Sequence, residues 1–296
     1  MNNIPRLRTL PAPEFSWTAR WRSLCAIGLA AVCLGPVFST LAAEEGCQSI
    51  FDGQTLSGWN KAAGDTINKN YLGGEWKVED GAIVGRQLPP LVGSFLRTDA
   101  KYQDFDLLID VNPDWGCDSG IWIRTDDEGR CLQIFLDYLP GGNVGFLYGQ
   151  GTGGFASQPW QLEAVEEGGK VVGVKAVDQY DGVKVDGLLY SAKAEDFNKV
   201  WRHGEFNTLR IRCEGPQPLI TTWINGVKMM ELDGTTFRGK KVQDLRAGKF
   251  DAPQVWDQKK IQESNGGPGT IALQVHPGNR WNGFVRYKDI KIKTLP

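Results

Sequence analysis

The sequence has little net charge and few histidines. Its 296 residues include 33 Lys and Arg against 35 Asp and Glu, which gives a formal net charge of -2. This balance offers no electrostatic basis for binding nucleic acid or an anionic membrane. With 2 histidines in the chain, any site that uses imidazole chemistry has few candidates. No internal repeat and no low-complexity tract occurs.

The sequence also lacks an apolar run long enough to favour a membrane span. The run from Leu24 to Phe38 is shorter than the roughly 20 residues that a bilayer requires, and it contains Gly35-Pro36. Several arginines precede the run, and small residues follow it up to Ala43. This order is typical of a secretory signal peptide, with a membrane anchor as the alternative. We expect a signal peptide over 1–43, a single mature domain over 44–296, a periplasmic or secreted location, and no membrane insertion after signal removal.

Cysteine is sparse outside the signal peptide, where four of the 6 cysteines remain: Cys47, Cys117, Cys131 and Cys213. No two of them have C-x-x-C spacing, so a zinc site has little support. Export permits disulfides, and the pairing stays open among three possibilities. A bond between Cys117 and Cys131 is disfavoured, because the hairpin described below places them far from opposite one another.

The residues that are abundant favour a sheet protein with many turns. The chain has 37 Gly, 11 Trp and 23% charged residues, which leaves little from which to build long helices. Alternating segments predict strands in "EWKVEDGAIVG", "TTWINGVKMMEL", "GTIALQVHP" and "FVRYKDIKIKTL". Asp80-Gly81 and Asn225-Gly226 are hairpin dipeptides within the first two. "FDLLIDVNP" alternates as well, with its apolar side chains on one face: Phe105, Leu107, Ile109 and Val111.

The stretch from Leu139 to Glu205 is less periodic. It opens with the glycine-rich "GGNVGFLYGQGTGGF", and we expect loops and short strands on one rim of the sheet, with a short helix near residues 194–200. No strand-to-helix phosphate motif accompanies the glycines, which favours a turn network. Many short strands of this spacing predict an all-β, concanavalin-like two-sheet sandwich, or jelly roll, with long glycine-rich rim loops.

One predicted hairpin brings polar groups onto a single face. "DSGIWIRT" and "CLQIFLDY" form the hairpin if its turn is centred on residues 125–130, which pairs Trp122 with Gln133 and Asp118 with Asp137. Because side chains alternate along a strand, Ile121, Ile123, Ile134 and Leu136 then face the core. The opposite face collects the side chains of Asp118, Trp122, Arg124, Gln133 and Asp137. The same alternation in "IALQVH" turns Gln274 and His276 outward.

Such a face suits a carbohydrate. Aromatic rings cover the apolar faces of sugars, while bidentate donors and acceptors bind hydroxyl groups. We expect sugar contacts from five residues: Asp118, Trp122, Gln133, Tyr148 and Gln274. Structural interpretations stay open for neighbouring residues of the face, since Arg124 could form only a surface ion pair with Asp118 or Asp137 and Trp122 could cap an exposed sheet.

The chain resembles the 3-keto-disaccharide hydrolase family, also described as 3-keto-glucoside 1,2-lyases and hydratases. The resemblance covers about residues 50–296 and is carried by "FDGQTLSGWN", "EWKVEDGAIVG", "DSGIWIRT", "QIFLDY", "EFNTLRIRCEG", "TTWINGVKMMELDG" and "GTIALQVHPGNRWNGFVRYKDIKIKTLP", in that order. It implies a concanavalin-like sandwich. The chain departs from the family pattern at three places. Asp118 replaces an asparagine, Cys131 stands where a glutamate is common, and Phe206 replaces a tryptophan.

The resemblance implies cleavage of 3-keto-glucosides or 3-keto-disaccharides by proton abstraction at C2, elimination and hydration. This chemistry requires a base, a donor to the C3 oxygen, and an acid near the leaving oxygen. We expect His276 or Asp137 to be the base and Arg124 to stabilise the oxyanion. The sequence requires no cofactor, although Asp118, Asp137 and His276 leave a divalent metal as an alternative.

Other functions are compatible with the same residues. A non-catalytic carbohydrate-binding module is the main alternative, because each polar group named above can hold an oligosaccharide or glycoside without transforming it. A conventional glycosidase is disfavoured, since the acidic run around Glu231-Leu232-Asp233 lacks the expected paired carboxylates.

Overall fold

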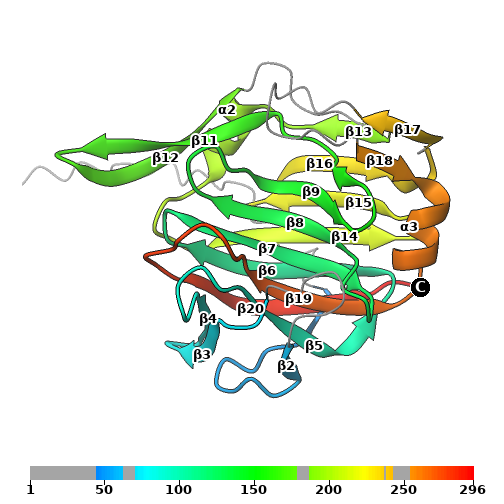
Figure 1. Cartoon of the computed structure of the whole chain (residues 1–296), viewed down its shortest axis with the longest axis horizontal. Helices are drawn as coiled ribbons and strands as arrows, with labels where there is room; N and C mark the ends of the chain where they lie inside the picture. The colour runs from blue at the N-terminus through cyan, green and yellow to red at the C-terminus, as the bar shows by residue number, and fades with distance from the viewer. Residues whose placement is uncertain (1–44, 63–70, 179–186, 237, 243–253) are drawn as a thin grey trace, which may run out of the picture. The chain divides into compact units, whose positions relative to one another are not determined.

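The structure is a computed structural model, and it describes residues 45–62, 71–178, 187–236, 238–242 and 254–296. The predicted signal peptide therefore lies outside the described residues. Most of the described chain forms two antiparallel sheets whose strands lie one sheet behind the other (Figure 1). This confirms the predicted all-β sandwich.

The larger sheet has nine strands within the described residues. Its order is β13 (Leu188–Ser191), β16 (Val227–Asp233), β15 (Leu219–Ile224), β14 (Asn207–Glu214), β6 (Phe105–Pro113), β20 (Val285–Thr294), β4 (Ala82–Arg86) and β3 (Glu75–Glu79), with β1 (Gln48–Ser49) paired to β20. The predicted hairpins fall at β3–β4 and β15–β16. Their turn residues Asp80, Gly81, Asn225 and Gly226 all adopt the positive φ angles that such turns require.

The second sheet has seven strands in the described part of the chain and carries the predicted polar face. Its order is β10 (Gly154–Phe155), β9 (Val144–Gln150), β8 (Cys131–Tyr138), β7 (Cys117–Thr125), β19 (Gly269–Val275), β5 (Ser94–Tyr102) and β2 (Trp59–Ala62). The β7–β8 register has Trp122 opposite Gln133 and Asp118 opposite Asp137, which confirms the predicted hairpin.

Smaller elements border the two sheets. The helix α2 (Ala194–Val200) lies where the sequence predicts it, and α3 (Gln258–Asn265) precedes β19. The remaining elements are the two-stranded ribbons β11 (Trp160–Glu167) with β12 (Lys170–Asp178) and β17 (Arg238–Val242) with β18 (Gln254–Asp257), and the short helix η1 (Gly234–Thr236). Figure 1 shows the β11–β12 ribbon extending beyond the edge of the sheets. The stretch from 139 to 205 thus contains more regular strand than its sequence pattern indicates.

The core fills the space between the sheets. Apolar side chains of alternate positions contribute from both sides, among them Ile109 of β6, Ile211 of β14, Ile121 of β7 and Leu273 of β19, all fully buried. A side chain of this kind contributes roughly 1.5–3 kcal/mol when it is buried. Two hydrogen bonds link the sheets inside this core, from Thr222 Oγ1 to Gly145 O at 2.6 Å and between Ser119 Oγ and Tyr287 Oη at 2.6 Å.

Two of the cysteines lie in this core. Cys117 and Cys213 are fully buried and carry free thiols. Burial raises the pKa of both thiols, that of Cys213 to about 12. The Cys117–Cys131 bond that the sequence disfavours is therefore not formed.

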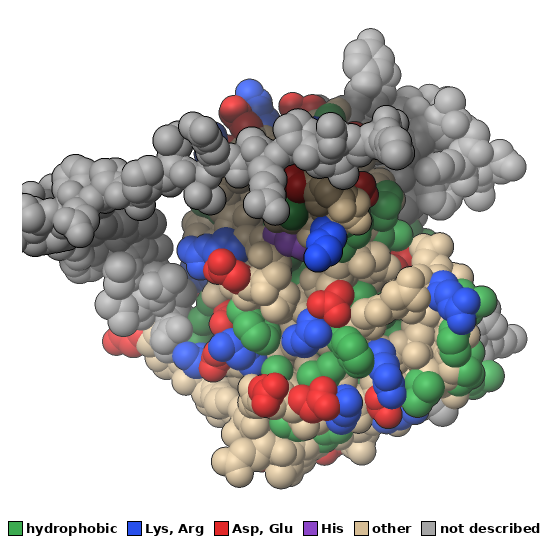
Figure 2. All heavy atoms as spheres, turned by 90° about the vertical axis from the view of Figure 1, so that its left-hand side faces the viewer, with side chains coloured by type: hydrophobic (Ala, Val, Ile, Leu, Met, Phe, Trp, Pro, Cys, Tyr) green, Lys and Arg blue, Asp and Glu red, His purple; other side chains and the backbone are tan. Residues whose placement is uncertain are grey.

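No helix among the described residues is long and apolar enough to cross a membrane. On the face that Figure 2 presents, the described Lys and Arg side chains are interspersed with Asp and Glu. This mixture agrees with the near-neutral charge of the chain.

Candidate functional site

The candidate site lies on the outer face of the seven-stranded sheet, where three ionisable side chains stand in a row across three neighbouring strands. Asp137 of β8 is opposite Asp118 of β7. His276 directly follows β19, and its backbone N–H donates to Asp118 O at 3.1 Å. Because neighbouring strands lie about 4.8 Å apart, the row spans about 10 Å. The sequence prediction that Asp118, Asp137 and His276 share one face is confirmed.

His276 and Asp118 form a close pair. His276 Nδ1 lies 3.4 Å from Asp118 Oδ2, and the imidazole side chain is 40% exposed, against 14% for the carboxylate. Asn279 Nδ2 donates to the same Oδ2 at 3.3 Å. Nδ1 is buried beside this carboxylate without a hydrogen bond to it, so Asp118 is an electrostatic neighbour of the imidazole, and the exposed part of the ring lies away from Nδ1.

A chain of amides lies one step further along the sheet. Gln133 Nε2 donates to Gln274 Oε1 at 3.0 Å, and Gln274 Nε2 donates to the Tyr71 hydroxyl at 2.8 Å. Gly120 lies between the two glutamines, opposite Gln274 on one side. A Cβ at Gly120 would lie 2.6 Å from Gln133 Nε2, so a glycine is needed for Gln133 to reach across β7.

Tyr71 covers the amide chain and is almost fully buried. Its ring stacks on Phe95 at a centroid distance of 4.0 Å and meets the His276 ring edge-on at 6.2 Å. Burial raises the pKa of the Tyr71 hydroxyl well above its ordinary value, and the charges of Asp118 and Asp137 add to the rise. The hydroxyl, which accepts from Gln274, keeps its own proton as a hydrogen-bond donor well beyond the pH at which an exposed tyrosine loses it.

Two sequence predictions for this face are wrong. Trp122 does point to the outer face, but it is fully buried against Phe95 and Tyr71, so it offers no open ring to a sugar. Arg124 does not lie on this face at all. The β7–β19 register shifts between Thr270 and Ala272, and Arg124 adopts a φ of 48°. This bulge breaks the alternation on which the prediction depended.

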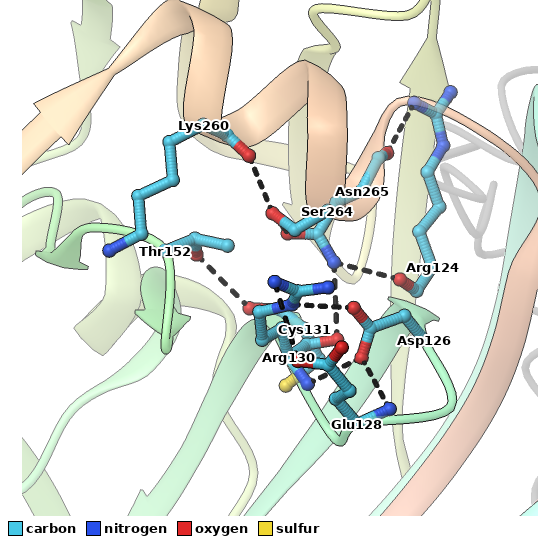
Figure 3. A network of polar contacts seen from close by, with 9 residues as sticks. All are labelled: Arg124, Asp126, Glu128, Arg130, Cys131, Thr152, Lys260, Ser264 and Asn265. Carbon is cyan, nitrogen blue, oxygen red and sulfur yellow. Dashed lines mark hydrogen bonds and ion pairs between the residues drawn. The ribbon is translucent and has the colours of Figure 1, made fainter. Parts of the chain in front are cut away.

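The Arg124 side chain is instead buried in a structural network. Its guanidinium donates to Gln103 O at 2.6 Å, Gly215 O at 2.7 Å and Asn265 O at 3.2 Å, and it pairs with Asp104 at 2.7 Å. Figure 3 shows Asn265, at the end of α3, bonded to Arg124 both through that contact and through its own amide, which donates to Arg124 O at 2.9 Å. Arg124 therefore fastens α3 to the end of β7 and cannot stabilise an oxyanion on the outer face.

Gln133 and Gln274 have the predicted facing but not the predicted exposure, since they are 6% and 1% exposed and their amides bond each other and Tyr71. They therefore support Tyr71 and do not themselves offer an open contact to a sugar.

Tyr148 of β9 is opposite Gln133, partly exposed, with its ring 6.1 Å from that of Phe135. Burial raises the pKa of the Tyr148 hydroxyl. Cys131, at the position of the family glutamate, is buried in an apolar cluster with Tyr71, Phe95, Trp122 and Ala272.

Sequence reasoning missed Tyr71 and Asn279. Tyr71 comes from a segment far from β7 and β19 in the chain, so no local pattern places it over them. Asn279 follows His276 by three residues in "HPGNRW", a loop signal that could have marked it as a neighbour of the histidine. Within the described residues, no three His, Cys, Asp or Glu side chains are arranged to hold a metal ion. The alternative of a metal held by Asp118, Asp137 and His276 thus gains no support.

Comparison with solved structures finds matches at low identity and low structural similarity. A proposed glycosyl hydrolase from Parabacteroides distasonis, solved at 1.70 Å, is 19% identical, with a TM-score of 0.45 over 85% of this chain and 95% of that one. A second from the same organism is 21% identical, with a TM-score of 0.45 over 80% of this chain and 99% of that one. The carbohydrate-binding module CBM66 from Bacillus subtilis is 11% identical, with a TM-score of 0.39 over 80% and 96%.

Comparison with curated proteins finds no match. A family model, in contrast, matches residues 46–293, nearly the whole of the predicted mature domain. The chain therefore belongs to the family of 3-keto-alpha-glucoside-1,2-lyase-like domains.

Proposed function

We propose that the protein is an enzyme that cleaves 3-keto-glucosides or 3-keto-disaccharides by removing the proton on C2, expelling the group on C1 and adding water to the unsaturated product. The observation that carries the proposal is the row of Asp137, Asp118 and His276 beside the Tyr71 hydroxyl. Membership of a carbohydrate-active family supports a sugar substrate.

His276 is the proposed base. A ketone at C3 acidifies the hydrogen on C2, so a neutral imidazole can remove it. Asp118, 3.4 Å from Nδ1, stabilises the imidazolium as it forms, and the imidazole is 40% exposed, so Nε2 is the nitrogen we assign to the proton transfer. The electron pair of the broken C2–H bond moves to the C3 oxygen, giving an enediolate.

Tyr71 replaces Arg124 in our assignment as the donor to that oxygen. A tyrosine hydroxyl is protonated at neutral pH, burial raises its pKa further, and the hydrogen bond from Gln274 Nε2 fixes the position of the hydroxyl. A donor that is already in place when charge develops contributes more than one that must reorganise. Collapse of the enediolate breaks the C1–O bond and leaves a C1–C2 double bond.

Asp137 lies at the opposite end of the row from His276. The strands that carry the two residues stand about 10 Å apart with that of Asp118 between them, so we infer that a sugar ring lying over Asp118 can reach both side chains. We assign Asp137 to the leaving oxygen, which must gain a proton as the C1–O bond breaks. Water then adds across the double bond, with OH to C1 and H to C2, and the sum is hydrolysis.

Substrate preference tests the proposal. The mature protein is incubated with a chromogenic 3-keto-glucoside and, separately, with the unoxidised glucoside. We expect release of the aglycone from the oxidised sugar alone, because only that sugar has an acidic C2 hydrogen. Binding of both without release would favour a carbohydrate-binding module, and equal release from both would favour an ordinary glycosidase.

The proposal includes export to the periplasm or the medium. It is supported by the basic and apolar order of residues 1–43. Cell fractionation with N-terminal sequencing tests it, and we expect a mature chain that begins near Glu44.

A further inference from the structure

Gln87 is a buried glutamine outside the row of ionisable groups. It directly follows β4 and is 7% exposed. Its Nε2 donates to His276 O and to Asn279 O, each at 2.7 Å. Its Oε1 accepts from Leu91 N at 3.0 Å and from Trp281 N at 3.1 Å. Both protons and both lone pairs of the amide are thus used.

The two carbonyls that Gln87 holds belong to the two partners of Asp118. The His276 side chain pairs with Asp118 through Nδ1, and the Asn279 side chain donates to the same carboxylate. One amide therefore fixes the backbone at both residues whose side chains contact the Asp118 carboxylate. A displacement of this loop would move the imidazole and the amide together.

The other side of Gln87 holds a strained backbone. Leu91 has a φ of 70°, a left-handed conformation that is unfavourable for leucine. Its N–H is bound by Gln87 and its carbonyl by Gly278 N at 3.1 Å. Strain of this kind persists only where the surroundings enforce it, and it gathers at functional sites. Here the two hydrogen bonds at Leu91 enforce the strained conformation, and they connect the 87–91 loop to the loop that carries His276.

We propose that Gln87 is a positioning residue, which sets the orientation of His276 relative to Asp118 by fixing the 276–281 loop. The catalytic part of this inference rests on the function proposed above. The claim that Gln87 fixes the position of His276 does not depend on the proposed function, because it concerns the surroundings of His276 alone.

Gln87→Glu separates the two sides of the amide. The carboxylate still accepts from Leu91 N and Trp281 N, but it cannot donate to His276 O and Asn279 O. On a 3-keto-glucoside at pH 8 we expect kcat to fall by roughly 10- to 100-fold, the cost of a misplaced catalytic group, with KM nearly unchanged. Protonation of the glutamic acid restores one donor, so the ratio of the Q87E rate to the wild-type rate should rise as the pH falls to 5.

Gln87→Met is the second variant, and it tests the same proposal if Q87E does not fold. The methionine side chain has a similar length to glutamine but forms none of these hydrogen bonds. We expect a loss of kcat at least as large as that of Q87E at pH 8, with a ratio to wild type that does not change with pH.

Asn207→Asp is the matched control. Asn207 is a fully buried amide at the start of β14 in the other sheet, and its side chain bonds Arg202 N, Arg202 O and Glu205 O.

Proton NMR of the imidazole signals gives the readout that is independent of activity. The chain has 2 histidines, so His203 is an internal reference. We expect Q87E and Q87M to shift or broaden the His276 signal and leave that of His203 unchanged. An unchanged His276 signal, or a loss of kcat no larger than in N207D, would overturn the proposal. If the wild-type protein does not cleave the substrate, the proposed function fails, and the NMR comparison still decides whether Gln87 positions His276.

Discussion

Asp118→Asn tests the proposed base most sharply, because it removes a charge and preserves the shape of the side chain. Asp118 Oδ2 lies 3.4 Å from His276 Nδ1. At that separation two unit charges attract by about 1 kcal/mol in bulk water and by about 5 kcal/mol at an effective dielectric constant of 20. The imidazole is 40% exposed, so we take about 2–3 kcal/mol for the imidazolium that forms in the transition state.

This energy corresponds to a fall in kcat of about 30- to 150-fold, at roughly 1.4 kcal/mol for each factor of ten. The assay is steady-state release of a chromogenic aglycone from a 3-keto-glucoside. KM should change little, because the charge pair is completed only as the proton is transferred. A D118N enzyme with a kcat within threefold of wild type would refute the assignment of His276 as a base supported by Asp118.

Asp106→Asn is the control for this experiment. Asp106 is a buried carboxylate of β6 in the other sheet, paired with Arg210 at 2.7 Å. Its substitution should lower the free energy of unfolding and leave kcat of the folded enzyme unchanged.

Three further predictions follow from the fold. Arg124→Ala should lower the free energy of unfolding, measured by urea denaturation, by about 3–5 kcal/mol, because it leaves Asp104 and three carbonyls without their buried partner. A folded R124A protein with a greatly reduced kcat would contradict this structural role. In Gly120→Ala, the new Cβ would displace the Gln133 side chain. The loss of its hydrogen bond to Gln274 should lower kcat/KM by about 5- to 10-fold. A normal kcat/KM would show that the Gln133–Gln274 amide chain does not contribute to the site. Stability should fall as the pH rises from about 9 to 12, because the Cys213 thiol, whose pKa burial raises to about 12 from 9.0, stays protonated in the folded state while the unfolded state loses its proton. Thermal unfolding across this range, with Cys213→Ser as the comparison, checks it, and an equal decline in both proteins would contradict it.

The sequence predicts much of the fold because its strand patterns are local. Ile121 and Ile123 alternate with Trp122, and the dipeptides Asp80-Gly81 and Asn225-Gly226 mark turns that the structure confirms. The helix over 194–200 also falls where expected. The register of β7 and β8 follows from burying one face, because a slip of one residue would expose the isoleucines.

The candidate site is harder to predict from local strand patterns. Arg124 fails because a bulge opposite Ile271 interrupts the alternation, and nothing in "WIRT" indicates the positive φ of Arg124. Trp122 has the predicted facing but not the predicted exposure, since Tyr71 from a distant segment covers it. Tyr71 and Gln87 act through contacts with residues some two hundred positions away, and periodicity carries no information on such contacts.

In the proposed reaction, bond cleavage proceeds through loss of the C2 hydrogen, and the isotope content of the product records whether that hydrogen was lost. A 3-keto-glucoside is turned over in D₂O, the sugar product is trapped by rapid reduction, and the deuterium at C2 is measured by mass spectrometry and NMR, against an enzyme-free sample of the 3-keto sugar held for the same time. Elimination followed by hydration predicts one deuterium at C2 in nearly every product molecule. Product that keeps its C2 hydrogen would rule out elimination, because direct displacement at C1 leaves that bond intact.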